Sequence, residues 1–398
     1  MHSQHPLPQR NLTSHCTART ACCGGQITAR WLALLLAAAL AGCASDVPRD
    51  EGATGLRPAD ARALINGLLP AGTTDRPGWA TDIFAAFSAL ELPATRNNIC
   101  SVLAIAEQES GMRTDPAVAN LPVITWAEID RRASQAGVPS LVVRAALQLA
   151  SPNGKTYAER IDTARTERDL SLLFEDFIGM VPMGQRLFGG FNPVRTGGPM
   201  QVSMAFAEAQ SAAKPYPYPV NESLRHEVFS RRGGLYFGIA HLLDYPTTYD
   251  KALYRFADFN AGRHASRNAA LQNAISLASG IPLALDGDLV SHDKADLKTV
   301  GSTELAARVL AERLDLSPTQ IRRALEQGQA PALERNPFYQ RTFALAERLQ
   351  GRPLPRAVVP QLVLQSPKFT RKLTTEWFAG RVDERFKRCL SRAATGAG

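Results

Sequence analysis

The sequence contains no hydrophobic run long enough to cross a lipid bilayer. Its longest strongly apolar stretch extends only from Trp31 to Ala41, whereas a membrane-spanning helix needs about 20 consecutive apolar residues. Stretches in which apolar and polar residues alternate, as they do along half-buried strands, are also scarce. The composition, with 45% hydrophobic and 21% charged residues, excludes wholesale disorder. We therefore expect a mainly α-helical globular protein that is not a polytopic membrane protein.

The sequence also lacks the spacings that mark common metal and cofactor sites. It has no His-Glu-x-x-His pair, calcium-loop spacing, Gly-x-Ser-x-Gly elbow, Walker loop or dinucleotide fingerprint. His226, His241, His264 and His292 show no paired ligand spacing. His241 lies inside an apolar run and is more typical of a core histidine. We expect neither a metal ion nor a cofactor.

The N-terminal segment has the features of an export signal. Arg30 precedes the apolar run, and this run ends in Leu40-Ala41-Gly42-Cys43. A basic residue, an apolar stretch and small residues together form a secretory signal peptide. The last four residues resemble the bacterial lipobox, in which the cysteine becomes the lipidated first residue of the mature protein. The alternative is a buried helix that happens to end in Gly-Cys.

The lipobox implies a leader and signal peptide over residues 1–42 and a flexible tether over 43–57. The tether is rich in Asp, Pro, Gly and Thr. Acylated Cys43 would contact membrane lipid. Ala44 and Ser45 follow it without an aspartate, which by resemblance to Gram-negative lipoproteins favours the outer membrane. We expect a lipid-anchored protein on the periplasmic face of that membrane.

Export limits the partners that the protein can meet and the oxidation state of its cysteines. Removal of the leader takes away three arginines and no acidic residue, so the formal net charge falls from +8 to +5. Export argues against nucleic acid as a partner. A modest positive charge is mostly a solvated surface, and it also suits the carboxylates of cell-wall stem peptides or anionic lipid. Cell-envelope proteins are further candidate partners. Besides Cys43, the mature chain keeps Cys100 and Cys389. They form one disulfide or remain two buried thiols.

Apolar residues recur at helical spacing along most of the mature chain, and this spacing predicts helices there. Helices are expected at 82–90, 98–110, 126–136, 139–150, 157–165, 168–180, 202–212, 234–243, 248–260 and about 369–393. Ser317 begins a further helix as the cap of a capping box. We expect one domain over 58–280 with a helical insertion at about 125–190, and a C-terminal helical region over 281–398.

One carboxylate continues the apolar face of the helix at 98–110. Ile99, Val102 and Ile105 share a face, and Glu109 projects onto it four residues after Ile105. Glu107 projects about 160° away from Glu109. Desolvation of Glu109 would raise its pKa, as a general acid at neutral pH requires. The alternative is a glutamate that merely emerges from the core where the helix ends.

Two further segments combine polar side chains with an apolar setting. In Gly198-Pro199-Met200-Gln201 a glycine allows close approach of the backbone to a ligand, and the glutamine offers both a donor and an acceptor. Asn260 continues the apolar face of the helix at 248–260 and must find hydrogen-bond partners there. The alternatives are a glycine turn that enters a helix and a structural asparagine.

These segments together resemble the three ordered motifs of soluble lytic transglycosylases. The resemblance rests on Gln108-Glu109-Ser110-Gly111-Met112, Gly198-Pro199-Met200-Gln201 and Phe259-Asn260-Ala261-Gly262, with Gly234–Gly238 as an accompanying helix and Ala117 after the first motif. It covers about 97–123 and 190–275. Pro199 and Phe259 depart from the leucine and tyrosine of that family, and 91 residues separate Glu109 from Gln201. The whole chain also resembles an uncharacterised family of bacterial lipoproteins.

The resemblance implies a lysozyme-like fold and a peptidoglycan substrate. Glu109 would protonate the glycosidic oxygen between N-acetylmuramic acid and N-acetylglucosamine, and would then accept the proton of the muramyl 6-hydroxyl. The product would be a 1,6-anhydro sugar, formed without water and without a second catalytic carboxylate. For hydrolysis instead, Asp115 and Asp258 are the candidate second carboxylates.

The resemblance also assigns residues to substrate contact. Ser110 and Gln201 would orient the acid or the sugar, Met200 and Phe259 would line the cleft, and Asn260 would bind sugar or hold Glu109. Two other functions remain open: a non-catalytic peptidoglycan-binding or scaffolding lipoprotein on the same fold, and an unrelated helical assembly lipoprotein. Convergence of Glu109, Gln201 and Asn260 in one groove would separate the last from the other two.

Overall fold

The computed structural model describes residues 55–180, 182–183, 186, 189–290, 300–364 and 372–395. The expected signal peptide, Cys43 and most of the tether lie outside these residues. The described chain is predominantly helical, which confirms the prediction of a mainly α fold. Within it, no helix combines the length and the hydropathy that a membrane crossing requires.

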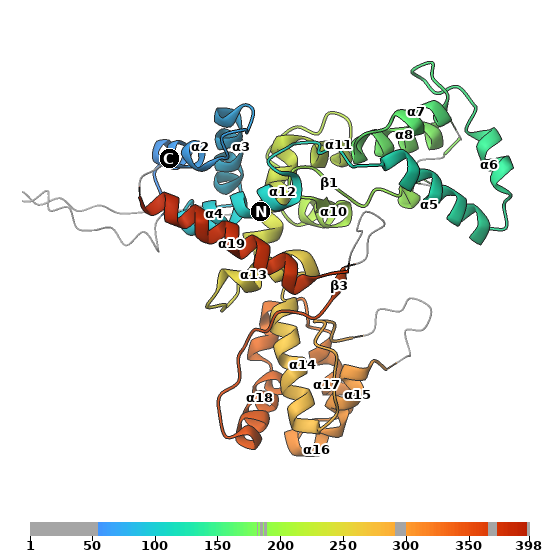
Figure 1. Ribbon diagram of the computed structural model, residues 1–398. Coiled ribbons are helices and arrows are strands. Elements are labelled where there is room, and N and C mark those ends of the chain that lie inside the picture. The colour runs from blue at the N-terminus through green and yellow to red at the C-terminus, as the bar shows by residue number, and fades with distance from the viewer. Residues whose placement is uncertain are drawn as a thin grey trace, which may run out of the picture. The chain divides into compact units, whose positions relative to one another are not determined.

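Eight helices, labelled in Figure 1, contribute side chains to the first core, a cluster of buried apolar residues. They are α2 (Pro58–Leu68), α3 (Arg76–Ala89), α4 (Arg96–Ser110), α10 (Met204–Ala213), α11 (Leu224–Phe229), α12 (Arg231–Leu243), α13 (Ala252–Ala261) and α19 (Thr375–Ala394). Helix α12 lies deep in this core, with Leu235, Phe237 and Ile239 fully buried. A helix that is apolar on all sides is expected to be enclosed by its neighbours.

Helix α4 shows how local sequence sets the ends of a buried helix. The Thr95 side chain accepts a hydrogen bond from the backbone N–H of Asn98 and caps the first turn. Every residue from Ile99 to Ala106 is buried. Gly111 follows the last turn with a φ of 60°, a conformation in which glycine avoids the penalty of a Cβ. The carboxyl end of α4 is therefore fixed at Ser110, where the sequence predicted it.

The described residues also form two short antiparallel strand pairs. Strand β1 (Thr196–Gly197) pairs with β2 (Val202–Ser203), with Thr196 opposite Ser203. Strand β3 (Val363–Leu364) pairs with β4 (Leu373–Thr374), with Val363 opposite Thr374. The segment predicted as a helix from 202 begins as β2, and α10 starts two residues later.

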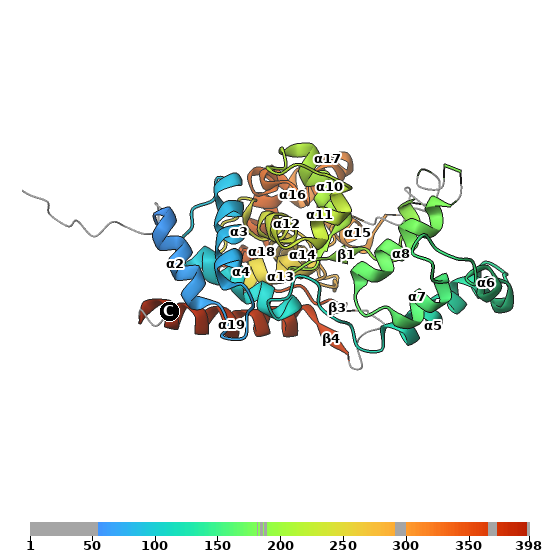
Figure 2. The same cartoon turned by 90° about the horizontal axis from the view of Figure 1, so that it is seen from above.

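The insertion has a small core of its own. It contains α5 (Leu121–Gln135), α6 (Ser140–Ala146), α7 (Tyr157–Thr163), α8 (Glu167–Gly179) and the 3₁₀ helix η1 (Gly189–Phe191), in green in Figure 2. Capping boxes begin α7 and α8 at Thr156 and Thr166. Five buried residues form its core: Leu147, Tyr157, Ala158, Ile161 and Leu173.

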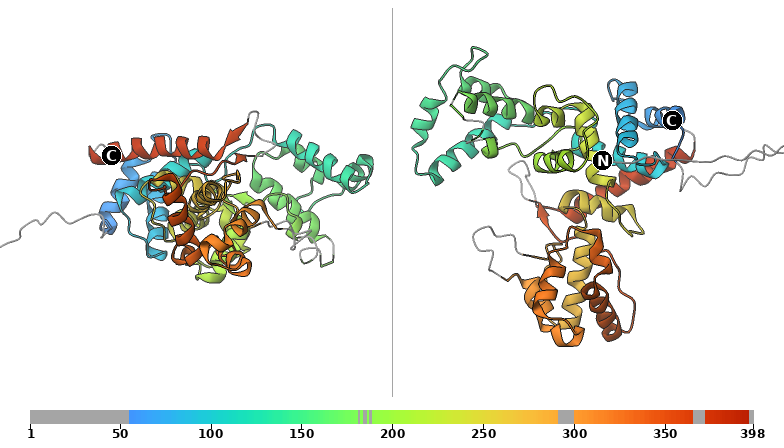
Figure 3. Two further views of the ribbon diagram at one scale, coloured as in Figure 1. Left: turned by 90° about the horizontal axis from the view of Figure 1, so that it is seen from below. Right: turned by 180° about the vertical axis from the view of Figure 1, so that it is seen from behind.

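A second core divides the chain differently from the expected boundary at 280. It contains α14 (Ala265–Ser279), α15 (Ser302–Val309), α16 (Ala311–Leu314), α17 (Pro318–Leu325), the 3₁₀ helix η2 (Pro331–Arg335) and α18 (Pro337–Gln350), in orange shades in Figure 3. The predicted capping box at Ser317 is present. Helix α14 thus belongs to this second core, whereas α19 returns to the first core.

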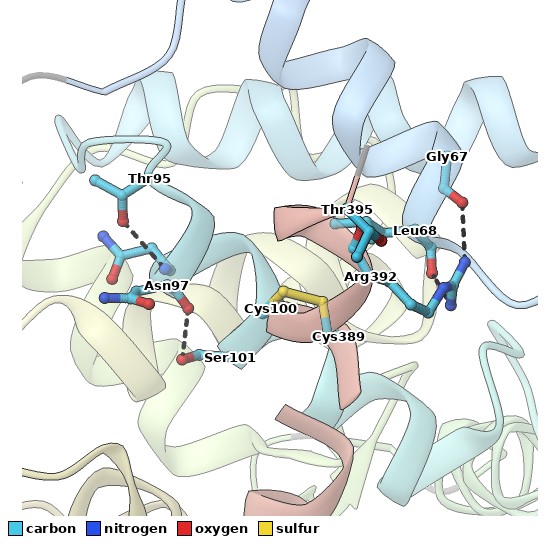
Figure 4. Close-up of a disulfide and its surroundings, with 10 residues drawn as sticks. Gly67, Leu68, Thr95, Asn97, Cys100, Ser101, Cys389, Arg392 and Thr395 are labelled. Carbon is cyan, nitrogen blue, oxygen red and sulfur yellow. Dashed lines mark hydrogen bonds between the residues drawn. A yellow bond between two sulfur atoms is a disulfide. The ribbon is translucent and has the colours of Figure 1, made fainter. Parts of the chain in front are cut away.

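The C-terminal helix α19 is bound to α4 by a disulfide. Cys100 and Cys389 are joined across 289 residues of sequence, with their Cα atoms 5.5 Å apart (Figure 4). This is one of the two states that the sequence left open for these cysteines. Near the same end, the Arg392 guanidinium donates to the carbonyl oxygens of Gly67 and Leu68 at 3.1 Å. The last helix therefore closes the first core from the far end of the chain.

Candidate functional site

A cavity of about 790 Å³ brings the predicted polar residues together. Helix α4 contributes Glu109, the turn between β1 and β2 contributes Gln201, and α13 contributes Phe259 and Asn260. The remaining lining comes from Pro116, Ala117, Val118, Glu167, Thr196, Ser203, Phe206, His241, Ala261 and Gly262. Residues 109, 201 and 260 thus meet at one cavity although the sequence separates them widely.

The two glutamates of α4 point to different surroundings. Glu109 is partly buried and lines the cavity. Glu107 lies 3.3 Å from the guanidinium of Arg385 on α19, so it serves as an ion-pair partner between helices. This divergence agrees with the predicted angle between the two side chains. Of these two carboxylates, Glu109 is therefore the one that lines the cavity.

Gln201 reaches the cavity through a strained turn. Its φ of 49° lies in the left-handed region, which costs energy for residues other than glycine. The turn is closed by a bond from the Gln201 backbone N–H to the Gly198 oxygen at 3.1 Å. The Thr196 hydroxyl donates to Gln201 Oε1 at 3.2 Å. These contacts fix the direction of the Gln201 amide.

Glycines let this turn press against α12. At Gly198, with a φ of 73°, an added Cβ would lie 2.1 Å from the backbone oxygen of Val228. At Gly234 it would lie 2.4 Å from the Pro199 ring. No larger residue fits such approaches without movement of the backbone. The pairing of the Gly-Pro-Met-Gln turn with Gly234 therefore has a steric basis.

Asn260 is held by the C-terminal helix. The hydroxyl of Thr375, which is fully buried in the first turn of α19, donates to Asn260 Oδ1 at 2.9 Å. Because Oδ1 serves as the acceptor there, the Asn260 amide nitrogen is the group that offers protons to the cavity. The predicted need of this asparagine for a partner is met by a residue 115 positions away.

His241 lies in the cavity wall, where the sequence predicted a core histidine. Its ring packs between Phe206 and Phe259, with centroid distances of 4.7 and 4.9 Å. Burial lowers the pKa of His241 to about 4, and the Arg263 charge adds to this effect. The ring is therefore neutral at pH 7. Its Nε2 lies 3.1 Å from the Phe259 carbonyl oxygen, so Nε2 carries the proton because a carbonyl can only accept.

Two predicted substrate contacts do not face the cavity. Met200 is fully buried in the first core, and an added Cβ at Gly238 would lie 2.5 Å from its sulfur. The prediction that Met200 lines the cleft is therefore wrong, because Gly238 opens a space that the methionine fills. Ser110 is also buried, and its hydroxyl donates to the Ala106 oxygen and accepts from the Arg113 N–H. It closes the end of α4.

Neither predicted second carboxylate lines the cavity. Asp258 is fully buried and accepts hydrogen bonds from the Tyr245 and Tyr249 hydroxyls and from the backbone N–H groups of His264 and Ser266. It holds the corner between α13 and α14. Asp115 is partly buried, and desolvation raises its pKa, but it does not belong to the cavity lining.

A different carboxylate, Glu167, lines the cavity from the insertion. It occupies the first turn of α8, where acidic residues are common because they favour the helix N-terminus. Because an acidic residue is ordinary at this position, the sequence alone does not indicate that Glu167 lines a cavity. The insertion is fixed here by a bridge between Ala117 and Thr166 and by a bond from the Val118 N–H to the Arg165 oxygen at 2.9 Å. The cavity therefore includes part of the insertion.

Among the described residues, no three His, Cys, Asp or Glu side chains gather as ligands for a metal ion. The polar groups of the cavity are a carboxylate from each of two helices, two amides, two hydroxyls and one neutral imidazole. Such groups can donate to and accept from a sugar, and a partly buried carboxylate can exchange a proton.

Comparisons with known proteins extend over nearly the whole chain. A family profile described as "Protein of unknown function (DUF1615)" matches residues 72–392. The protein named "Uncharacterized protein YaiW" from Escherichia coli strain K12 is 52% identical over 361 residues, which cover 91% of this chain and 98% of that protein. No solved structure matches.

Proposed function

The chain belongs to the DUF1615 family of proteins of unknown function, and we propose that it is a peptidoglycan-cleaving lipoprotein of the lytic transglycosylase type. One observation carries the proposal: Glu109, Gln201 and Asn260, each from a different motif, line one cavity of about 790 Å³. That volume lies within the range of small-ligand sites. The partners proposed here are peptidoglycan glycan strands and, through acylated Cys43, the outer membrane on its periplasmic face.

Glu109 is the proposed general acid and base. In the first step its carboxyl proton moves to the glycosidic oxygen while the bond from that oxygen to the muramyl C1 breaks. The acetamido oxygen of the substrate stabilises the positive charge at C1. In the second step the muramyl 6-hydroxyl oxygen bonds to C1, and its proton returns to Glu109. The atoms balance without water, and no second carboxylate takes part.

The amides have proposed roles in orientation. Asn260 offers its amide protons to an acceptor in the cavity, because Thr375 occupies its oxygen. Gln201 is fixed by Thr196 and its own turn. The neutral ring of His241 and the ring of Phe259 form an apolar wall against which a sugar ring can pack.

The test is product analysis with matched variants. Residues 44–398 and its Glu109→Gln and Glu107→Gln variants are incubated with peptidoglycan sacculi, and released muropeptides are identified by mass. We expect anhydro-muropeptides from the parent chain and from Glu107→Gln, and none from Glu109→Gln. Glu107 is the control because it lies on the same helix but does not belong to the cavity lining. Equal release by Glu109→Gln would exclude the proposed role.

A non-catalytic binding protein is the second candidate function. The observation in its favour is that the insertion helix α8 lines the same cavity through Glu167, whereas Ser110 and Met200 are buried away from it. If the protein only binds peptidoglycan, sacculi would release no product. The parent chain would sediment with the sacculi, and the Glu109→Gln variant would do so equally. Products with a reducing end would indicate hydrolysis, with Glu167 as the second carboxylate to examine.

A further inference from the structure

A second cavity, of about 780 Å³, lies beside the candidate site. We call it the apolar cavity. Its walls come from α5, α6, α8 and the segment 193–196, and its apolar lining includes Leu121, Ile124, Ile129, Val143, Leu170 and Phe174. Most of these side chains are only partly buried. Among the described residues of the insertion, the cluster of buried residues that forms its core has five members, and the side chains of this lining face the apolar cavity instead.

The two cavities adjoin. Glu167 and Thr196 line both of them. On one side lie the carboxylate of Glu109 and the amides of Gln201 and Asn260, and on the other side lie mainly aliphatic and aromatic side chains. A molecule that extended across Thr196 would therefore need a polar end and an apolar end.

One pair of opposite charges in the wall of the apolar cavity, Glu128 and Arg132, is compensated within the protein. The Glu128 carboxylate lies 2.6 Å from both Arg131 and Arg132, and these partners lower its pKa to about 2. Glu167 and Arg195 lie at the wall shared with the candidate site or next to it. The interior of the cavity thus offers contact area rather than charge.

The size of the cavity indicates what could occupy it. Concave sites of 300–1,000 Å³ are typical for small molecules, whereas a stable protein interface needs about 800 Å² on each partner and a broad surface. A hydrocarbon chain fits an apolar hollow of this kind because each buried methylene contributes about 0.8 kcal/mol. Because Glu167 and Thr196 line both cavities, a chain attached to a sugar is the favoured occupant.

We propose that the apolar cavity holds the hydrocarbon chain of a lipid-linked sugar, whose sugar head occupies the candidate site. This inference rests on the proposed function in one respect, namely that the candidate site binds sugar. It deepens that function because it names a substrate class, a glycan that carries one hydrocarbon chain. The insertion would then select glycans that carry a hydrocarbon chain, which the cavity with Glu109 cannot do by itself.

The test measures binding by titration calorimetry, with probes below their critical micelle concentrations. The probes are the methyl, octyl and dodecyl β-glycosides of N-acetylglucosamine, and dodecylphosphocholine as a chain without a sugar. We expect the dodecyl glycoside to bind at least tenfold more tightly than the octyl glycoside, since each buried methylene adds about fourfold. Dodecylphosphocholine should bind at least tenfold more weakly than the dodecyl glycoside.

Variants locate the binding. Leu170→Gln places an amide in the cavity wall, and Ala133→Phe fills the cavity from α5 without adding a polar group. Each should weaken binding of the dodecyl glycoside at least tenfold, and circular dichroism establishes that each variant folds. Leu141→Gln is the matched control, because Leu141 is 78% exposed in the same insertion and does not line the cavity. It should bind within twofold of the parent chain.

Several results would overturn the inference. They are an affinity that does not depend on chain length, equal binding of dodecylphosphocholine, and a loss in Leu141→Gln as large as that in Leu170→Gln. The result is independent of the cleavage assay. Chain-dependent, sugar-selective binding without release from sacculi would retain the inference and reject the enzyme, whereas anhydro-muropeptides without chain dependence would do the reverse.

Discussion

Removal of the disulfide between Cys100 and Cys389 should destabilise the protein strongly. The bond closes a loop with a sequence separation of 289 residues. It joins α4, which carries Glu109, to α19, whose Thr375 side chain donates to Asn260. A disulfide stabilises mainly because it restricts the unfolded chain, and the restriction grows with loop length. The entropy relation for a loop of this length gives about 5.7 kcal/mol at 25 °C.

The observed loss should be smaller than this limit. Removal of natural disulfides typically costs about 2–5 kcal/mol, since unfolded chains retain structure. We expect a loss in that range for the double variant Cys100→Ala with Cys389→Ala. Both cysteines are buried and the substitution leaves two small spaces in the first core, so part of the loss is lost packing.

The assay is urea unfolding of residues 44–398, with and without a reductant. The parent chain should lose stability when reduced, while the double variant should not respond to the reductant. This difference separates the covalent bond from the packing, because reduction keeps both sulfur atoms in place. An unfolding midpoint of the parent chain that is the same with and without reductant would refute the reasoning and favour two buried thiols.

Two further predictions concern the Thr375–Asn260 contact and two buried histidines. Thr375→Val removes the donor to Asn260 Oδ1 and should lower the rate of muropeptide release about 5- to 30-fold, since a lost bond with an unsatisfied partner costs about 1–2 kcal/mol. Thr375→Ser should restore the rate to within about threefold, and equal losses in both variants would reject the positioning role. Burial lowers the pKa of His241 to about 4 and that of His264 to about 3. The unfolded chain then binds more protons below pH 6.5, so the free energy of unfolding should fall as the pH drops from 6.5 toward 4, by about 1 kcal/mol per histidine at pH 5.5. Urea unfolding at pH 7 and 5.5 measures this fall, and an equal fall in His241→Gln would contradict the contribution of His241.

The parts of the fold that local chemistry decides could be predicted. Helix α4 ends at Ser110 as expected, because Gly111 adopts a left-handed conformation there. The capping box at Ser317 is likewise a local signal. The position of Glu109 away from Glu107 follows from helical geometry alone. Each of these features depends on a few neighbouring residues.

The parts that depend on distant contacts could not be predicted. Met200 is buried because Gly238, on another helix, leaves room for it, and nothing near Met200 in the sequence indicates this. Glu167 has the appearance of an ordinary first-turn acid, although it lines the cavity. The boundary predicted at 280 rests on a local change from a helical pattern to a turn-rich segment. The division between the two cores depends instead on packing, which places α14 in the second core and α19 in the first.

Helix α19 shows how the local sequence motifs depend on contacts with a distant part of the chain. The third motif of the lytic transglycosylase resemblance ends at Gly262, so the motifs alone imply a site that is complete without the C-terminal region. In the folded chain, α19 contributes the Thr375 hydroxyl to Asn260, the Arg385 charge to Glu107 and Cys389 to the helix that carries Glu109. The bond to Asn260 and the disulfide each tie α19 to one of the two motif helices, and none of the three α19 residues lines the cavity. A chain cut before α19 would keep all three motifs and lose the relation between Glu109 and Asn260. The folded unit that holds Glu109 and Asn260 is therefore set by packing, and it extends about 130 residues past Gly262, the end of the last motif.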